Sequence, residues 1–224
     1  LGLIYATSGM MNEHTSVHCT GSMKLGNRAF RCWKHSGHGN TDLPKAITQS
    51  CDDYFYKGSL QLGIERMSKG LIRMGLGKKT GIDLPNEFIG TVPSREWKRK
   101  KFNKPWYQGE TLNSSIGQGD FLVTPMQMAQ FTALMATGKL PVPHIAKTIG
   151  DNPYTPKPLD VLTPAEKKKL PIVQRAMRGV CNDPGGTARG HVHTRFPIAG
   201  KTGTAQTTGI AQGVKQRQSE HSME

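Results

Sequence analysis

The feature that most limits how this chain can fold is a four-residue pattern, Thr-Pro-x-Gln/Glu, which occurs at 124–127 and again at 163–166. In such a pattern threonine caps the free backbone N–H groups, proline suits the first helical turn, and the Gln or Glu side chain reaches back to the cap. The pattern predicts two helices. One runs to about Ala136 with Gly138 just beyond it, and the other ends before Asp183.

Shorter elements can be placed around these two helices. Asp42 can cap a helix over residues 43–47, and apolar side chains at helical spacing predict another over 64–74. Residues 78–115 read as one long connection rich in glycine, proline and basic residues. Near the end, residues 196–206 read as an apolar strand that runs into small residues.

Composition indicates that loops make up much of the chain. Hydrophobic residues are 35% of the 224, and there are 26 glycines and 14 prolines, which is loop-rich for a compact domain. The first 40 residues are polar and read as irregular. The net charge of +14 favours anionic partners such as nucleic acid, acidic membrane surfaces or acidic polymers. No apolar stretch approaches the roughly 18–20 residues that cross a bilayer.

Three short motifs occur in a suggestive order. Residues 50–52 are Ser-Cys-Asp, 117–119 are Gly-Gln-Gly, and 201–203 are Lys-Thr-Gly at the end of the predicted strand. Each motif alone is an ordinary turn, helix-end or strand sequence. Together they resemble the Ser-x-x-Lys, Ser-x-Asn and Lys-Thr-Gly set that serves acyl transfer in penicillin-binding proteins and class A β-lactamases.

The flanking residues make this resemblance specific. Residues 50–56, 105–109 and 116–119, together with Trp97, resemble the elongation-type class B penicillin-binding proteins (penicillin-binding protein 2). The similarity implies an α/β (α+β) transpeptidase fold like that of penicillin-binding proteins and serine β-lactamases, incomplete at both ends. It also implies a partial transpeptidase domain over 1–206, followed by a polar tail over 207–224 that we expect to be disordered.

The resemblance assigns roles for an acyl transfer, which needs a nucleophile, a base, a proton relay and oxyanion donors. Ser50 would be the relay hydroxyl, Asp52 would hydrogen-bond catalytic groups or the substrate amide, and Lys201 would supply positive charge. In the same strand, the Thr202 hydroxyl would bind the substrate carboxylate, Gly203 would leave room for the substrate, and the Thr204 backbone N–H would bind the oxyanion. The assigned catalytic residues are Ser50, Asp52, Lys201, Thr202, Gly203 and Thr204, and the substrate-binding residues are Gly117, Gln118 and Gly119.

The nucleophile motif itself is absent. No serine in these 224 residues is followed by lysine three places later. In the family, the nucleophile helix lies just before a segment resembling Leu1–Ile4. We therefore expect the chain alone to be inactive and to form no covalent adduct with penicillin.

A second constellation suggests a metal. Structural zinc sites take four Cys or His ligands, and the chain offers Cys19, Cys32, His38 and Cys51, although with long, irregular gaps. Some elongation-type relatives bind zinc near this position, and the resemblance implies a zinc-binding loop region over about 17–52. A disulfide among the three cysteines, or plain buried thiols, are the alternatives. Cys181 is expected to be a small core residue.

The resemblance implies a peptidoglycan D,D-transpeptidase that cross-links cell-wall stem peptides during elongation by an acyl-serine mechanism and is a target of β-lactams. Its expected partners are stem peptides, β-lactams in the full-length protein, and the membrane glycosyltransferase of the elongation machinery. It would act at the periplasmic face of the inner membrane, with an anchor in the N-terminal part outside this chain.

Two alternatives stay open. A serine β-lactamase or β-lactam sensor shares the motif set, but the long stretch from Trp97 to Gly109 favours the transpeptidase. A zinc-stabilised basic module that binds nucleic acid would suit the charge and the Cys/His cluster. Against it, the chain lacks zinc-finger spacing and interleaved basic and aromatic residues, so we expect no nucleic-acid partner.

Overall fold

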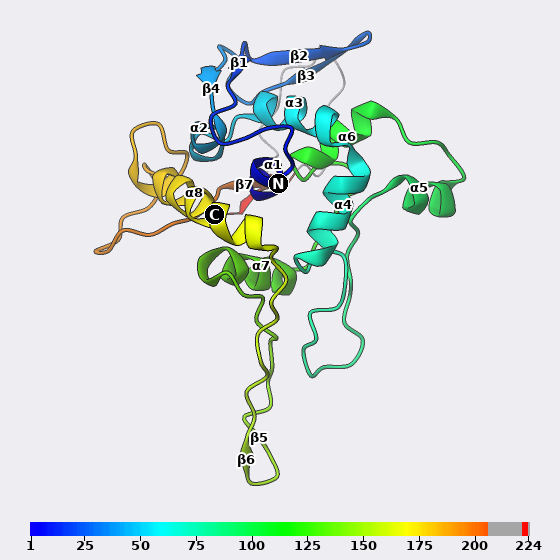
Figure 1. The fold of residues 1–224 in the computed structure, drawn as a ribbon, viewed down its shortest axis with the longest axis vertical. Helices are drawn as coiled ribbons and strands as arrows, with labels where there is room; N and C mark the ends of the chain where they lie inside the picture. Colours follow the sequence, from blue (N-terminus) through cyan, green and yellow to red (C-terminus); the bar gives the residue numbers. More distant parts are fainter. Residues whose placement is uncertain (206–220, 224) are drawn as a thin grey trace.

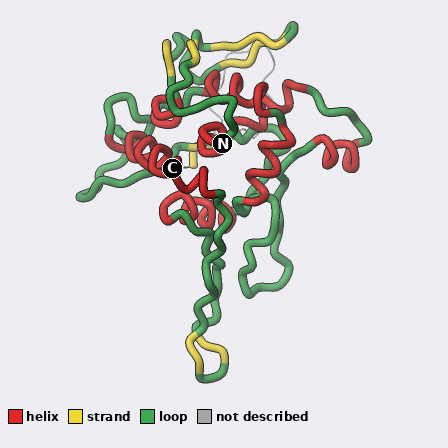
Figure 2. The backbone as a smooth tube through the Cα atoms, viewed as in Figure 1, coloured by secondary structure: helices red, strands yellow, loops and turns green. Residues whose placement is uncertain are grey.

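A computed structural model describes residues 1–205 and 221–223 of the chain (Figure 1). Helices dominate, and the strands are short (Figure 2). In order, the elements are α1 Gly2–Thr7, β1 Val17–Cys19, β2 Ser22–Leu25, β3 Arg28–Arg31, β4 Gly39–Thr41, α2 Leu43–Thr48, α3 Asp52–Leu62, α4 Ile64–Arg73, α5 Arg95–Phe102, α6 Gln108–Ser115, α7 Pro125–Thr137, β5 Thr148–Ile149, β6 Asn152–Pro153, α8 Pro164–Asn182, β7 Gly203–Ala205 and β8 His221–Met223.

The predicted caps form as the sequence indicates. Thr124 and Thr163 each accept a hydrogen bond from the backbone N–H three residues on, and the Gln or Glu side chain there accepts one from the backbone N–H of the threonine. Helix α7 ends at Gly138, whose φ of 76° is the left-handed conformation that suits glycine. Asp42 caps α2 by accepting from Lys45 N at 2.9 Å. The expected helix from residue 64 is α4.

The core is built around the short first helix. Figure 1 shows α1 in the middle of the molecule, and it packs against α8, α2 and α3. Leu3, Ile4 and Tyr5 are buried, and the Tyr5 hydroxyl donates to Phe55 O at 2.9 Å. Cys181, near the end of α8, is also buried, as expected of a small core residue. The segment that opens the sequence therefore organises the helical core.

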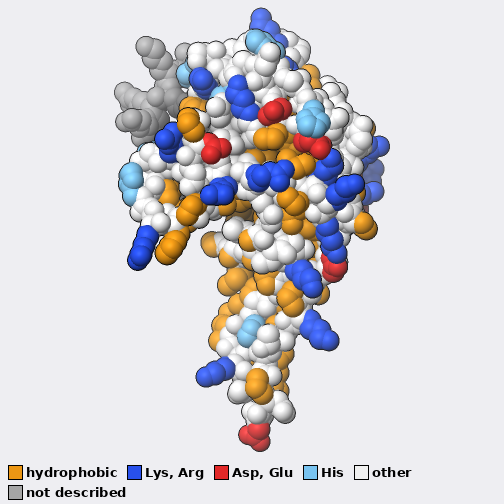
Figure 3. Space-filling model, turned by 60° about the vertical axis from the view of Figure 1, so that its left-hand side comes forward, with side chains coloured by type: hydrophobic (Ala, Val, Ile, Leu, Met, Phe, Trp, Pro, Cys, Tyr) orange, Lys and Arg blue, Asp and Glu red, His pale blue; other side chains and the backbone are white. Residues whose placement is uncertain are grey.

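The described strands form four separate two-stranded antiparallel sheets, with β1 beside β4, β2 beside β3, β5 beside β6 and β7 beside β8. Strands β5 and β6 lie at the end of a ribbon that projects from the body (Figure 1). Its exposed apolar side chains are visible in Figure 3 and include Ile145, Ile149 and Leu159. Within residues 1–205 and 221–223, no helix is long and apolar enough to cross a membrane.

Three expectations need correction. Residues 1–40 are not wholly irregular, because they hold α1, three short strands and the start of a fourth. Residues 78–115 are not one connection, because they contain α5 and α6. Helix α5 escaped prediction because it lacks an apolar stripe; its signal is Ser94, whose hydroxyl accepts from Trp97 N at 3.1 Å. Helix α3, which begins at Asp52, the last residue of the Ser-Cys-Asp motif, was also not predicted.

The strand predicted over 196–206 is much shorter than expected. Gly200 N donates to Met177 O at 3.1 Å, and the Asn182 side chain donates to Ile198 O at 2.7 Å. These bonds hold the segment against α8, so strand pairing begins only at Gly203. Residue 206 and most of the predicted tail, 207–220 and 224, lie outside the described residues. Among the described residues β7 pairs with β8 alone, in a two-stranded sheet, so the other edge of β7 has no strand partner.

Candidate active site and metal centre

The turn between α2 and α3 carries the first motif. Ser50 has a φ of 53°, a left-handed conformation that is uncommon for a residue other than glycine. Its hydroxyl accepts a hydrogen bond from the Lys201 ammonium at 2.8 Å. The same ammonium donates to Thr202 O at 3.0 Å. Packing therefore joins two of the predicted catalytic residues that are 151 positions apart in the sequence.

Trp33 holds this turn from the other side. Its backbone N–H donates to the Asp52 carboxylate at 2.9 Å, and its indole N–H donates to Gln49 O at 3.0 Å. The two bonds fix the residues on either side of Ser50 and Cys51. Sequence analysis missed this role, and the available signal was that Trp33 directly follows the candidate ligand Cys32.

The electrostatics of Asp52 and Lys201 are coupled. Burial raises the pKa of Asp52 to about 7, although the Trp33 N–H and the charge of Lys201 oppose this rise. The local loss of water around the ammonium lowers the pKa of Lys201, and Asp52 opposes that change. Lys201 as a whole residue is exposed, so water still reaches its stem. The two shifts bring the pKa of the carboxyl and the pKa of the ammonium closer together than they are in free side chains.

The other motifs meet the same strand. Gln118 Nε2 donates to Thr204 O at 2.8 Å, which links the Gly-Gln-Gly turn to β7. Gly117 and Gly119 both have a φ of 77°, a conformation that glycine adopts without strain. The Thr202 hydroxyl lies 2.8 Å from the Thr187 hydroxyl, a neighbour that sequence analysis did not identify. Gly203 is the first residue of β7 and pairs with Met223 of β8.

The four candidate metal ligands also converge. Ligand atoms of Cys19, Cys32, His38 and Cys51 all lie within 4.8 Å of one another, and all four residues are buried. His38 Nδ1 is 3.6 Å from Cys19 Sγ and 3.5 Å from Cys32 Sγ. The cysteines are free thiols, so the disulfide alternative is not what the structure contains. Three soft sulfur donors and one imidazole form a donor set that suits zinc.

Local backbone geometry brings the ligands together. Cys19 is in β1 and pairs with Gly39 of β4, one residue after His38. Cys51 occupies the N-cap position of α3, and its thiol makes no capping hydrogen bond. At Gly37, whose φ is 77°, an added Cβ would lie 2.2 Å from Cys19 O, so only glycine lets the loop pass this close. The Cys51 thiol donates to Cys32, which lowers the pKa of Cys32 and raises that of Cys51.

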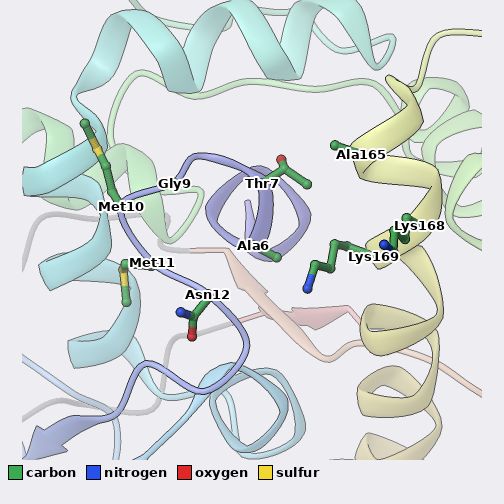
Figure 4. A pocket seen from close by; sticks show the side chains of 9 residues that line it. All are labelled: Ala6, Thr7, Gly9, Met10, Met11, Asn12, Ala165, Lys168 and Lys169. Atoms are coloured by element: carbon green, nitrogen blue, oxygen red, sulfur yellow. The ribbon is translucent and has the colours of Figure 1, made fainter.

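A separate hollow lies away from these residues. A cavity of about 410 Å³ opens between the end of α1 and the start of α8 (Figure 4). None of the predicted catalytic or metal-binding residues lines it. One of its lysines, Lys169, is paired with Glu13. The hollow is therefore distinct from the group around Ser50 and Lys201.

Comparisons with known proteins agree with this geometry. The penicillin binding protein transpeptidase domain family matches residues 3–223. Peptidoglycan D,D-transpeptidase MrdA of Haemophilus influenzae is 37% identical over 218 residues, which cover 93% of this chain and 33% of the relative. The chain thus spans about a third of the length of this curated relative.

Solved structures confirm the predicted fold class. The complex between penicillin-binding protein PBP2 and MreC from Helicobacter pylori superposes with a TM-score of 0.86 and 45% identity, covering 92% of this chain and 38% of that chain. A structure on the structural coordination of polymerization and crosslinking by a peptidoglycan synthase complex gives a TM-score of 0.81 and 34% identity, covering 93% and 36%. With nearly its whole length matched, the chain belongs to the family of penicillin-binding protein transpeptidase domains.

Proposed function

We propose that this chain forms most of the catalytic framework of a peptidoglycan D,D-transpeptidase of the elongation type. The observation that carries the proposal is the 2.8 Å hydrogen bond from Lys201 to Ser50, formed beside Asp52 and next to the link between Gln118 and Thr204. Hydrogen bonds thus link three motifs from distant parts of the sequence. The nucleophilic Ser-x-x-Lys motif, absent from these 224 residues, would come from a longer protein that contains them.

The site residues would divide the acyl transfer among themselves. A nucleophilic serine would attack the carbonyl of a terminal D-Ala-D-Ala bond, and the Ser50 hydroxyl would pass a proton to the departing amine. Lys201 and the Thr202 hydroxyl would hold the substrate carboxylate, and the Thr204 N–H would stabilise the oxyanion. Gly203 leaves room for the peptide to lie along β7. Gly117, Gln118 and Gly119 would line the substrate on the opposite side.

We also propose that Cys19, Cys32, His38 and Cys51 hold a structural zinc ion. Support comes from four buried donors whose ligand atoms lie within 4.8 Å of one another. Zinc would give tetrahedral bonds to these donors and stabilise polar loops that bury little apolar surface. Cys51 lies at the start of α3, directly between Ser50 and Asp52 in the sequence. The metal centre and the catalytic turn would thus be one rigid unit.

Zinc content of the purified chain tests the metal proposal. About one equivalent is expected in the wild type and much less in Cys51→Ser. Cys181→Ser is the matched control, because Cys181 is buried outside the cluster, and it should keep its zinc. Substoichiometric zinc in the wild type, or unchanged zinc in Cys51→Ser, would rule the site out.

The relatives suggest partners and location for the longer protein. One similar structure is a complex with MreC and another concerns a peptidoglycan synthase complex. We propose that a protein containing this chain works beside a membrane glycosyltransferase and an MreC-type partner. Its substrates would be peptidoglycan stem peptides, and its site would face the periplasm. β-Lactams would bind it by imitating the D-Ala-D-Ala end.

A fluorescent penicillin tests the enzyme proposal. A longer protein that supplies Ser-x-x-Lys should be labelled stably, and Lys201→Ala should reduce the labelling rate at least about tenfold, because a hydrogen bond between charged groups contributes about 1.5–3 kcal/mol. Lys157→Ala, on the exposed ribbon away from the site, is the matched control and should label normally. Absence of labelling in the parent protein would refute the proposal. Rapid release of the label would instead favour the β-lactamase alternative.

A further inference from the structure

Helix α5 carries a concentration of positive charge that the proposed catalytic group does not use. Five exposed basic residues lie within positions 95–104, and Glu96 is the single acidic residue there. Glu96 pairs with Lys100 at 2.7 Å, and both side chains are largely exposed. Like charges this close on a helix repel one another, so the segment gains stability when an anionic partner covers it. The exposed basic residues are Arg95, Arg99, Lys100, Lys101 and Lys104.

Aromatic rings border this charge. Trp97 and Phe102 meet edge to face with centroids 5.6 Å apart. The Lys101 ammonium lies over both rings, at 5.0 and 5.3 Å from their centroids. Phe102 is 45% exposed and Tyr107 is 60% exposed, although rings of this size are usually covered. The surface therefore offers cations and aromatic faces side by side, and the expectation that the chain lacks interleaved basic and aromatic residues is wrong for this segment.

This surface is a fixed platform although it lies at the edge of the molecule (Figure 1). Lys98 is buried and pairs with Glu110 of α6, and its ammonium is 4.7 Å from the centre of the Tyr107 ring. Tyr107 N donates to the same Glu110 carboxylate at 2.8 Å. Asn103 ends α5 in a left-handed conformation. Because these contacts fix the end of α5 and the Tyr107 ring in advance, they lower the entropic cost of binding a partner.

We propose that the outer face of α5, with Phe102 and Tyr107, is a second binding surface for a glycan strand that bears peptide carboxylates. Arg99, Lys100 and Lys101 would pair with the carboxylates, and the exposed rings would pack against the C–H faces of the sugars, because the face of an aromatic ring is electron-rich. The choice of a glycan among anionic polymers rests on the proposed function, whose substrate is such a strand.

Binding of soluble, uncross-linked peptidoglycan strands to the chain tests this surface. The triple variant Arg99→Gln, Lys100→Gln, Lys101→Gln keeps good helix formers and removes three charges. The matched control neutralises three exposed basic residues of α8 instead, and helicity is checked by circular dichroism in both. We expect about tenfold weaker binding for the α5 variant and less than about twofold for the control. The control residues are Lys168, Arg175 and Arg178.

The chemistry is tested by changing the rings and the ligand separately. Tyr107→Leu combined with Phe102→Leu keeps every charge and should weaken binding about threefold or more, a loss on the scale of one aromatic contact. Amidation of the strand's carboxylates should abolish the difference between the wild type and the α5 charge variant. Equal weakening in the α5 and α8 variants would overturn the inference. So would equally tight binding of duplex DNA or of anionic phospholipid vesicles.

The outcome separates this inference from the enzyme proposal. In a longer protein that contains Ser-x-x-Lys, the α5 charge variant should be labelled by fluorescent penicillin at the parent rate, because none of the residues proposed for acyl transfer lies in α5. If the parent is not labelled, the enzyme proposal fails. The strand-binding measurement still shows whether the α5 surface binds glycan strands. If labelling is normal and the α5 variant binds strands like the wild type, the second surface alone is wrong.

Discussion

Replacing Glu166 by alanine is expected to weaken the joint between helices α4 and α8. The Glu166 side chain is 4% exposed and accepts two hydrogen bonds from the Arg73 guanidinium, at 2.8 and 2.5 Å. It also accepts from the backbone N–H of Thr163 at 2.8 Å, which closes the capping box of α8. One carboxylate therefore acts both as an ion-pair partner and as a helix cap.

The size of the loss in unfolding free energy follows from how exposed Glu166 and Arg73 are. Removing one member of a buried ion pair costs about 3–5 kcal/mol. The Arg73 side chain is 36% exposed, so its guanidinium regains water and the cost falls below that range. The lost cap adds about 1 kcal/mol. We expect Glu166→Ala to lower the free energy of unfolding by about 3 kcal/mol, and Glu166→Gln, which can still cap, by about 2 kcal/mol.

Urea unfolding followed by circular dichroism measures this difference and its pH dependence. Burial alone raises the pKa of Glu166, but the hydrogen bonds from Arg73 and Thr163 outweigh burial and lower the pKa. A lowered pKa means that the stabilisation is complete above the unfolded-state pKa and is lost as pH falls through the folded-state pKa. The difference in the free energy of unfolding between the wild type and Glu166→Gln should therefore shrink below about pH 4. Glu96→Gln, at an exposed pair, is the control. A gap that stays constant in acid would refute the reasoning.

Three further outcomes are expected. Trp33→Phe keeps the backbone bond to Asp52 but loses the indole bond to Gln49, so β-lactam acylation of a longer, Ser-x-x-Lys-containing protein should slow about 3- to 10-fold; an unchanged rate would contradict this. Gly37→Ala should cost about 2 kcal/mol or more of unfolding free energy and lose zinc, whereas Gly26→Ala, with open space around it, should keep its zinc. The 224-residue chain should show no β-lactam adduct by mass spectrometry, because it has no Ser-x-x-Lys.

Local chemistry explains what could be predicted correctly. The caps at Thr124 and Thr163 each join residues three apart, so the sequence alone determines them and the helices that follow. Helix α5 was missed because its polar surface lacks the apolar stripe by which helices are recognised. The strand over 196–206 was overestimated because an apolar run predicts burial but not the partner, and here α8 replaces a neighbouring strand.

The sequence by itself determined the family, the capped helices and the identity of the residues proposed for catalysis and metal binding. Only the tertiary structure decided how these residues meet. The Lys201 bond to Ser50 and the convergence of the four buried Cys and His side chains depend on α8 and on the β1–β4 pair packing around the catalytic turn. Such contacts span up to 151 positions, and their free energy comes from burying the whole core around α1. No local pattern encodes that geometry, because packing fixes it only when the distant segments are folded together.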